Sequence, residues 1–255
     1  MTTRGKFLLM GTIVCGAMSL STVACTQLMA NNNKTYIDMD TLELVQLEEP
    51  QEGDTVATIK TSLGDIKAVL YPEYAPKAVE NFTELAESGY YDDTYVYKTQ
   101  SGGFFAGSPE KDGGLGDKAD ESHEKVEKEL HQNLWPFKGA LYSVSTGSEK
   151  NIWKIITHKA KSFNGSRFAV LNTVEFTDEF KEDLLKSDKN TTVADAFIKN
   201  GGVPNLSQQV SIFGQTYEGF DVIEEITSSN TENSSDNTAE DIVIETIEIG
   251  KYTAE

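Results

Sequence analysis

Hydrophobic and polar residues alternate along two short runs near residue 60. Residues 56–60 and 66–71 both show the period of two that is typical of strands with one buried face. The four residues between them, Ser62-Leu63-Gly64-Asp65, have the composition of a turn. The pattern therefore predicts a β-hairpin at the start of a folded domain.

Apolar residues then recur at helical spacing. Val79, Phe82 and Ala86 fall on one face of a helix with 3.6 residues per turn. Pro76 suits the first turn of that helix, and Gly89 suits the position just after its last turn. A single amphipathic helix is expected between these two residues.

The rest of the chain alternates short apolar runs with polar or glycine-rich segments. Many short strands, few helices and no repeated strand–helix–strand unit indicate a mainly β domain, built as a closed barrel or a sandwich. Buried strands are expected over 139–144, 168–171, 210–213 and 242–249, helices over 177–187, 192–200 and 221–226, and irregular chain over 99–118 and 228–240.

The first 24 residues differ in kind from this domain. Arg4 and Lys6 precede an apolar run over 7–18, which is the layout of a secretory signal and is too short for a convincing permanent membrane span. Small residues before Cys25 resemble the lipobox of bacterial lipoproteins, in which the cysteine is acylated and becomes the new N-terminus. The alternative is plain secretion with cleavage near Ala24.

Cysteine usage and charge bear on the same question. Of the two cysteines, Cys15 would leave with a signal over 1–24, so Cys25 would remain without a partner for an internal disulfide. Loss of the signal would change the net charge from −19 to −21, and such acidity argues against nucleic acid as a partner. Residues 25–54 are expected to form a flexible tether and residues 55–255 the folded domain.

The common catalytic constellations are missing from the sequence. The three histidines, His123, His131 and His158, lack the spacing of metal ligands, and neither a metal nor a cofactor is expected. The glycine-rich run 112–117 lacks the Gly-Lys-Ser/Thr ending of a phosphate-binding loop, and no Gly-x-Ser-x-Gly elbow is present. An enzyme built on this chain needs a reaction with little covalent chemistry.

Five segments together resemble the cyclophilins, which are peptidyl-prolyl cis–trans isomerases. The resemblance implies a closed eight-stranded antiparallel barrel capped by two helices, with extra helical and loop insertions. It also implies proline-containing unfolded or extended polypeptides as partners. The segments run through roughly residues 55–250 in the family's order: IKTSLGDIKAVLYPEYAPKAVENFTELAESGYYDD (59–93), KGALYSVSTG (138–147), FNGSRFAVL (163–171), VSIFGQTYEGFDVIEEI (210–226) and IVIETIEI (242–249).

The resemblance assigns two candidate catalytic residues. Lys98 falls where active cyclophilins have an arginine that hydrogen-bonds the substrate as its amide twists. A guanidinium donates in two directions whereas an ammonium is a point charge, so Lys98 is expected to do this less well. Arg167 is expected to return a guanidinium to the groove from the opposite wall; the alternative is that it pairs with a local carboxylate.

The family's groove residues are mostly replaced in this chain. For example, the phenylalanine that helps to form the family's proline pocket falls on Gly103. The barrel positions follow the family's pattern while the groove positions do not, which lowers the expected turnover. The positions that the resemblance assigns to substrate binding are Phe104, Ala106, Ala169, Asn205, Leu206 and Val210.

One segment departs both from the family and from the acidic remainder of the chain. Residues 148–162 replace a short turn of compact cyclophilins, and the stretch from Lys150 to Arg167 carries five cations and no acid. Contact with an anionic surface is one interpretation, and a solvated β-extension with ordinary lysines is the other. The residues expected to make such a contact are Lys150, Trp153, Lys154, Lys159 and Lys161.

The leading interpretation is an exported, lipid-anchored prolyl isomerase with weak turnover. It would assist protein folding on the outer face of the bacterial cytoplasmic membrane. The competing interpretation is a cyclophilin-fold module that binds peptides or partners without turnover, and a third is a purely structural envelope protein. The family resemblance favours the first, and the altered groove residues favour the second.

Overall fold

The computed structural model describes residues 37–38, 40–111, 113, 125–148, 161–187, 191–229 and 241–254. The predicted signal, Cys25, His123 and His158 lie outside these residues, as does most of the basic segment, of which Lys161 is described. None of the helices in the described part has the length and apolar character needed to span a membrane.

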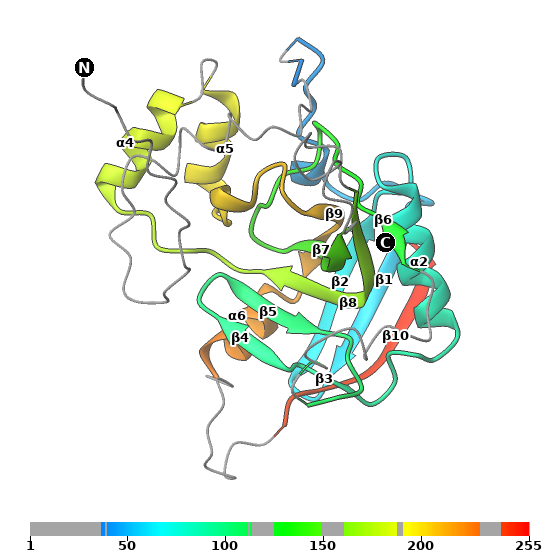
Figure 1. The fold of residues 1–255 in the computed structure, drawn as a ribbon. Coiled ribbons are helices and arrows are strands. Elements are labelled where there is room, and N and C mark those ends of the chain that lie inside the picture. Colours follow the sequence, from blue (N-terminus) through cyan, green and yellow to red (C-terminus); the bar gives the residue numbers. More distant parts are fainter. Residues whose placement is uncertain are drawn as a thin grey trace, which may run out of the picture.

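One antiparallel sheet contains all the described strands. Along it the order is β3-β10-β1-β2-β9-β7-β8-β5-β4, and β6 pairs with β8. The sheet is curled (Figure 1), and this mainly β architecture confirms the predicted fold class. The strands are β1 (Thr55–Thr61), β2 (Gly64–Leu70), β3 (Thr94–Tyr95), β4 (Lys98–Gln100), β5 (Gly103–Ala106), β6 (Val126–Glu127), β7 (Ala140–Ser148), β8 (Ser162–Leu171), β9 (Ser211–Glu218) and β10 (Val243–Lys251).

The expected ring of eight continuous strands differs in detail from the observed sheet. Strands β3 and β4, at the two ends of the order, belong to one segment of chain that is interrupted at Val96 and Tyr97. The Val96 N–H donates to the carbonyl oxygen of Ile242 beside β10, and the Tyr97 N–H donates to the carbonyl oxygen of Phe105 on β5. A single segment, 94–100, therefore bonds to both edges of the curled sheet in place of one continuous strand.

Two helices pack against the sheet, as the resemblance implies. Helix α2 (Pro76–Glu87) contacts β8, β9 and β10, and α6 (Phe220–Ser228) contacts β2, β4 and β5. The ring centroid of Phe82 on α2 lies 5.4 Å from that of Phe168 and 5.0 Å from that of Phe213. All three rings are buried, so this aromatic cluster holds α2 on the sheet.

The chain between β8 and β9 forms the expected helical insertion. It contains α4 (Asp178–Ser187), α5 (Thr192–Asn200) and the short 3-10 helix η2 (Pro204–Leu206), and α4 and α5 stand as a lobe beside the sheet (Figure 1). Together with residues 131–138 they enclose a second hydrophobic core. Its buried members are Trp135, Phe137, Leu184, Val193, Ala194, Ala196 and Phe197.

The segment expected to be irregular chain over 99–118 instead contains most of β4 and all of β5. Gly103 explains why the glycine content of this segment wrongly suggested a loop. Its φ is +145°, and a Cβ at this position would lie 2.4 Å from the carbonyl oxygen of Val170. Only glycine lets β5 approach β8 this closely, so the residue that suggested a loop is required by the sheet.

Residues 37–50, here called the strap, pack against the domain; Met39 within them is not described. The strap contains the 3-10 helix η1 (Val45–Leu47). Its apolar side chains, which include Leu42 and Leu44, contact the second core, and Gln46 is 5% exposed and hydrogen-bonded to the backbone of Trp135. The prediction of a flexible tether is therefore wrong for this part of residues 25–54, because widely spaced apolar residues in a polar segment find a partner surface that the local pattern does not reveal.

Candidate active site

Lys98 begins a row of side chains that crosses four strands. Lys98 on β4 pairs with Phe105 on β5. Phe105 pairs with Ala169 on β8, which in turn pairs with Tyr142 on β7. Because directly paired residues of an antiparallel sheet point to the same face, these four side chains lie together. They are called the outer row below.

The outer row lies on the face of the sheet opposite to Phe104 and Phe168, although Tyr142 and Ala169 are themselves buried. Phe104 and Phe168, the chain neighbours of two row residues, are buried in the core, and successive residues of a strand point to opposite faces. Lys98 is exposed, and its Nζ lies 5.9 Å from the centroid of the Phe105 ring, within the range of a cation–π contact. The ring of Tyr142 meets that of Phe105 edge-on at 6.3 Å. The row thus has a cation at one end and two aromatic rings along it.

An apolar cavity of about 240 Å³ adjoins the outer row. Its walls include Phe105, Tyr142 and Ala169 on the side of the barrel, and Val174, Val203 and Leu206 on the side of the helical insertion. The space at Gly102 is narrow, since a Cβ there would lie 3.3 Å from a methyl carbon of Val174 and of Val203. A cavity with these walls suits a small aliphatic ring or side chain.

The structure brings only part of the predicted substrate-binding set to this cavity. Ala169 and Leu206 are among the residues that line it. Phe104 also borders it, but its side chain is fully buried in the core, whereas Phe105 supplies the ring on the outer face. Ala106 is buried on the core side of β5, opposite Phe168. Neither Asn205 nor Val210 is among the described residues that line the cavity.

Arg167 lies on the same face as the outer row but apart from Lys98. It precedes Ala169 by two residues on β8, and β5 separates β8 from β4. Strands two apart in a sheet are about 10 Å apart, so the backbones of Lys98 and Arg167 are separated by at least about that distance. The Arg167 guanidinium donates from Nη1 to the carbonyl oxygen of Gly113 at 2.9 Å, which places part of its donor capacity on the backbone.

Phe105 and Tyr142 are the site residues that sequence reasoning missed. The alignment with the family pattern along the glycine-rich stretch placed the aromatic groove position at Phe104, which is one residue from Phe105. A shift of one residue exchanges the two faces of a strand. Tyr142 lies in a strand whose neighbours Leu141 and Ser143 are also buried, so no alternation marked it as a groove residue.

The hydroxyl of Tyr142 is held in its neutral form. Burial raises the pKa of Tyr142 above its ordinary value, and the nearby Tyr97 adds to the shift. A neutral phenol carries an O–H donor as well as an acceptor oxygen. The outer row therefore offers a polar donor on β7 in addition to the ammonium of Lys98.

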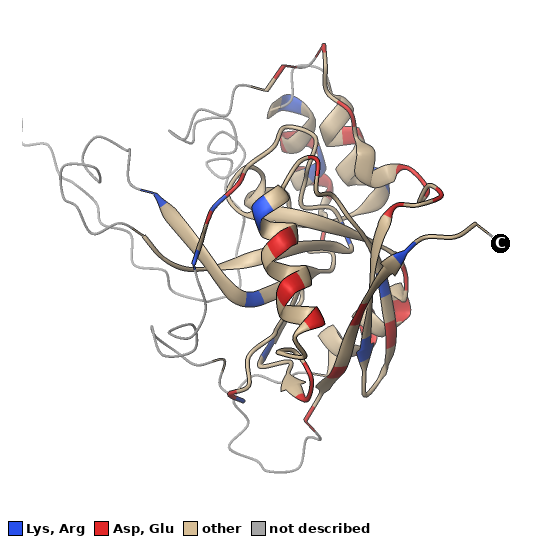
Figure 2. Cartoon of the chain, turned by 90° about the vertical axis from the view of Figure 1, so that its right-hand side faces the viewer, with Lys and Arg blue, Asp and Glu red and all other residues tan. Residues whose placement is uncertain are grey.

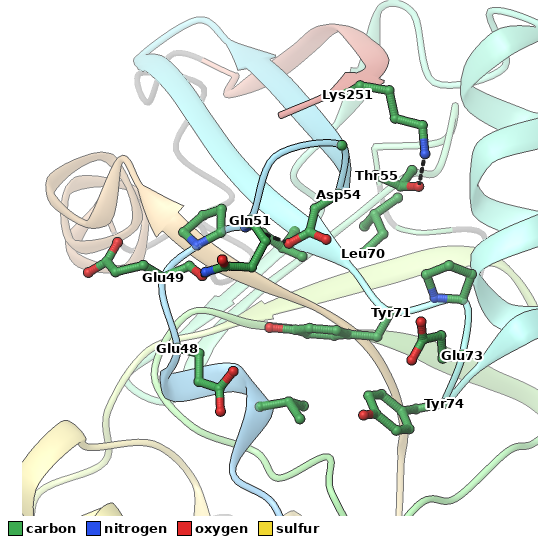
Figure 3. Close-up of a pocket in the computed structure, with 15 residues that line it drawn as sticks. Glu48, Glu49, Gln51, Asp54, Thr55, Leu70, Tyr71, Glu73, Tyr74 and Lys251 are labelled. Atoms are coloured by element: carbon green, nitrogen blue, oxygen red, sulfur yellow. Dashed lines mark hydrogen bonds between the residues drawn. The ribbon is translucent and has the colours of Figure 1, made fainter. Parts of the chain in front are cut away.

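A second cavity, of about 340 Å³, lies between the strap and the turn from β2 to α2. Figure 3 shows the ring of Tyr71 in its middle, with the carboxylates of Glu48, Asp54 and Glu73 around it. Burial raises the pKa of Tyr71, and the negative charges of Asp54 and Glu48 raise it further. The cavity shares no lining residue with the one beside the outer row, and its field favours cations.

The remaining charges of the described part are mostly acidic. The exposed side of α2 carries Glu80, Glu84 and Glu87 (Figure 2). Lys161, from the basic segment, forms an ion pair with Glu127, with 2.8 Å between Nζ and Oε2. This pairing favours the interpretation of an ordinary solvated lysine at that position. Within the described residues, no group of three or more His, Cys, Asp or Glu side chains is placed to hold a metal ion.

Comparison with curated proteins points to one family. A candidate bifunctional phosphatase/peptidyl-prolyl cis–trans isomerase of Streptococcus pyogenes serotype M6 is 30% identical over 210 residues, which are 82% of this chain and only 41% of that relative. A candidate peptidyl-prolyl cis–trans isomerase of Staphylococcus haemolyticus is 28% identical over 202 residues, which are 79% of this chain and 94% of the relative.

Solved structures show the same fold. A cyclophilin type peptidyl-prolyl cis–trans isomerase of Cryptosporidium parvum superposes with a TM-score of 0.54 and 23% identity, covering 79% of this chain and 99% of the other. A structure of that protein in the presence of the dipeptide Ala-Pro gives a TM-score of 0.52 and 22% identity over 76% of this chain and 98% of the other.

The family model described as cyclophilin type peptidyl-prolyl cis-trans isomerase/CLD matches residues 56–249, most of the chain. The matched range begins in β1 and ends in β10, so it contains nearly all of the curled sheet together with the outer row and its cavity. The chain belongs to the cyclophilin-type peptidyl-prolyl cis–trans isomerase family.

Proposed function

We propose that the protein catalyses cis–trans isomerisation of Xaa–Pro peptide bonds, with the proline ring in the apolar cavity and Lys98 as the donor beside it. The observation that carries this proposal is the position of a cavity of about 240 Å³ against the outer row, which ends in an exposed cation. Membership of the family supports it. Proline-containing unfolded or extended chains are the proposed substrates.

The chemistry requires no covalent intermediate. Resonance holds the peptide bond planar with a barrier of about 18–20 kcal/mol, and the enzyme must stabilise the twisted form in which this resonance is lost. The proline nitrogen then becomes a better hydrogen-bond acceptor. The Lys98 ammonium is proposed to donate to it, while Phe105 and Ala169 seat the ring. Exclusion of water by these apolar walls strengthens the interaction.

Weak turnover is part of the proposal. Loss of one positioned donor costs about 2.7–4 kcal/mol of transition-state stabilisation in comparable sites, which is about 100-fold or more in rate. Lys98 offers a point charge on a flexible stem in place of a planar guanidinium. Arg167 stands on another strand and donates to Gly113. We therefore assign the donor role to Lys98 and expect a rate well below that of relatives with an arginine.

A protease-coupled assay on a panel of proline tetrapeptides tests this function. The wild type should accelerate isomerisation above the buffer rate, and the acceleration should depend on Lys98. No acceleration for any peptide would overturn the proposal. Peptide binding without acceleration would instead support a cyclophilin-fold binding module, which the lysine at the donor position favours.

We also propose that the protein is exported and held by lipid at Cys25 on the outer face of the bacterial cytoplasmic membrane. The support is the basic start, the short apolar run and the small residues before Cys25. Cys25→Ser should move the protein from the membrane fraction to the medium or stall its processing. Unchanged membrane retention would remove the lipid proposal.

The basic segment is proposed to contact an anionic surface. The support is a cluster of lysines with Trp153 in a chain of net charge −19, and near an anionic membrane each lysine contributes on the order of 1 kcal/mol. The Cys25→Ser protein should bind anionic vesicles more than neutral ones at low salt. Replacing Lys150, Lys154 and Lys159 by glutamine should abolish the preference, and equal binding by both proteins would contradict it.

A further inference from the structure

The cavity beside the outer row has one wall that the barrel strands do not supply. Val174, Val203 and Leu206 lie in the segments before and after the α4–α5 insertion, whereas the opposite wall belongs to β5, β7 and β8. A wall made of connecting segments keeps its position only where other contacts hold it. The width of the cavity therefore depends on what these segments are bound to.

Hydrogen bonds attach this wall to residues 131–138. The Val203 N–H donates to the carbonyl oxygen of Pro136 at 2.9 Å. The Val174 N–H donates to the carbonyl oxygen of Gly202, the residue before Val203, at 3.2 Å. The two valines that narrow the cavity at its Gly102 side are thus linked to each other and to Pro136.

Gln46 of the strap holds residues 131–138 from the other side. The Trp135 N–H donates to Gln46 Oε1 at 2.5 Å, and Gln46 Nε2 donates to the carbonyl oxygen of Trp135 at 2.9 Å. Gln46 Nε2 also lies 3.0 Å from Gln215 Oε1 on β9, which it reaches as a donor. The side chain is 5% exposed, so loss of the carboxamide would leave buried polar groups without partners.

Hydrogen bonds hold the strap at several points along its length, and not at Gln46 alone. The Asp38 N–H donates to Gln132 Oε1 at 2.9 Å, and the Glu43 N–H donates to Asn133 Oδ1 at 3.2 Å. All of these strap residues precede residue 56, where the match to the family begins. The support of the cavity wall therefore comes from a part of the chain ahead of the family domain.

We propose that Gln46 is a positioning residue for the cavity. Through Trp135 and Pro136 it sets how far Val203 and Leu206 stand from the barrel wall, and thereby how tightly the cavity holds a proline ring. The identification of the ligand as a proline ring rests on the proposed function. The coupling between Gln46 and the wall rests on the hydrogen bonds alone.

Methyl-labelled NMR on the full chain tests the coupling without any ligand. In Gln46→Ala, the methyl resonances of Val203 and Leu206 should shift, whereas those of Val243, which lies on β10 opposite Tyr95, should stay in place. Gln46→Glu is the second variant, because it keeps an acceptor for the Trp135 N–H and loses both donated bonds. Gln51→Ala is the matched control, since Gln51 is exposed and its side chain donates locally to the carbonyl oxygen of Glu49.

Titration with an Ala-Pro-containing peptide tests the consequence. The Kd should rise by about two- to tenfold in the Gln46 variants and should not change in Gln51→Ala. A role confined to stability would lower the melting temperature of the Gln46 variants but leave the resonances of Val203 and Leu206 and the Kd unchanged, and this result would overturn the proposal. If the wild type binds no proline peptide, the proposed function fails, and the methyl resonances alone decide whether Gln46 positions the wall.

Discussion

Lys98 and Phe105 stand directly opposite each other on β4 and β5, with the ammonium nitrogen 5.9 Å from the centre of the ring. The ring also contributes to the wall of the apolar cavity. In the proposed function Phe105 seats the ligand and Lys98 supplies the donor, so a single strand pair would fix the distance between these two side chains.

The proposed role of Lys98 as the donor predicts that turnover depends on this residue. Lys98→Ala should lower kcat/KM by about tenfold to 100-fold, which is less than for a fully positioned donor because a flexible ammonium donates less well than a guanidinium. The activity of Lys98→Met should fall by a similar amount, since methionine keeps an unbranched side chain but has neither the charge nor an N–H donor. Lys60→Ala is the control, because Lys60 is a lysine of β1 paired with Glu248. The prediction is contradicted if the Lys98 variants keep the wild-type rate.

The narrow space at Gly102 predicts a binding defect without a large loss of stability. In Gly102→Ala the new Cβ would lie 3.3 Å from methyl carbons of Val174 and Val203, so the cavity should shrink. The Kd for a proline peptide should rise by about threefold or more, while the melting temperature changes little. Gly250→Ala is the control, since nothing lies within 4 Å of a Cβ at that position. Equal Kd values for both variants would show that the ligand does not enter there.

Burial of Tyr142 predicts a loss of stability at alkaline pH. Its pKa is raised in the folded protein, whereas in the unfolded chain a tyrosine ionises near its ordinary value of about 10. The stability that it contributes is therefore full below about pH 10 and is lost as the pH rises further. Urea unfolding between about pH 9 and pH 11.5 should show a smaller decline for Tyr142→Phe than for the wild type. Parallel declines would mean that Tyr142 ionises equally easily in both states.

Burial of His131 predicts a loss of stability at acidic pH. Burial lowers its pKa, and its Nδ1 accepts the Asn133 N–H at 3.2 Å, which only the neutral ring can do. Because the folded pKa is depressed, this stability is present above the ordinary pKa of about 6.5 and is lost as the pH falls below it. Between about pH 8 and pH 5 the unfolding midpoint should fall more for the wild type than for His131→Asn, which keeps an acceptor oxygen. Identical midpoints across this range would refute the assignment.

Local patterns predicted most of the framework. The hairpin of β1 and β2, helix α2 between Pro76 and Gly89, and helices α4, α5 and α6 follow from alternation, helical spacing and end signals that act over a few residues. These signals act within short segments, and the structure contains the predicted hairpin and helices in those segments. The curling of the sheet came from the family resemblance and not from any pattern within one strand.

The parts that the sequence did not reveal depend on contacts between distant segments. Gly103 suggested a loop in the sequence. The glycine is in fact required because the carbonyl oxygen of Val170, on another strand, leaves no room for a side chain. Phe104 and Phe105 point to opposite faces of β5, so an error of one residue in the alignment selects the wrong phenylalanine for the groove. Gln46 looked like part of a polar tether, since its partner Trp135 is 89 residues away.

The pairing of β1 with β10 has a consequence for how the domain is made. Thr55 lies opposite Lys251, and β10 also carries β3 on its other side. During synthesis β1 therefore keeps one unpaired edge until β10 has followed. Such non-local pairing slows folding and leaves an unpaired edge exposed to other chains in the meantime. The sheet cannot be completed before β10 is made, and a chain that loses only that strand leaves one edge of β1 unpaired and disconnects β3 from β1.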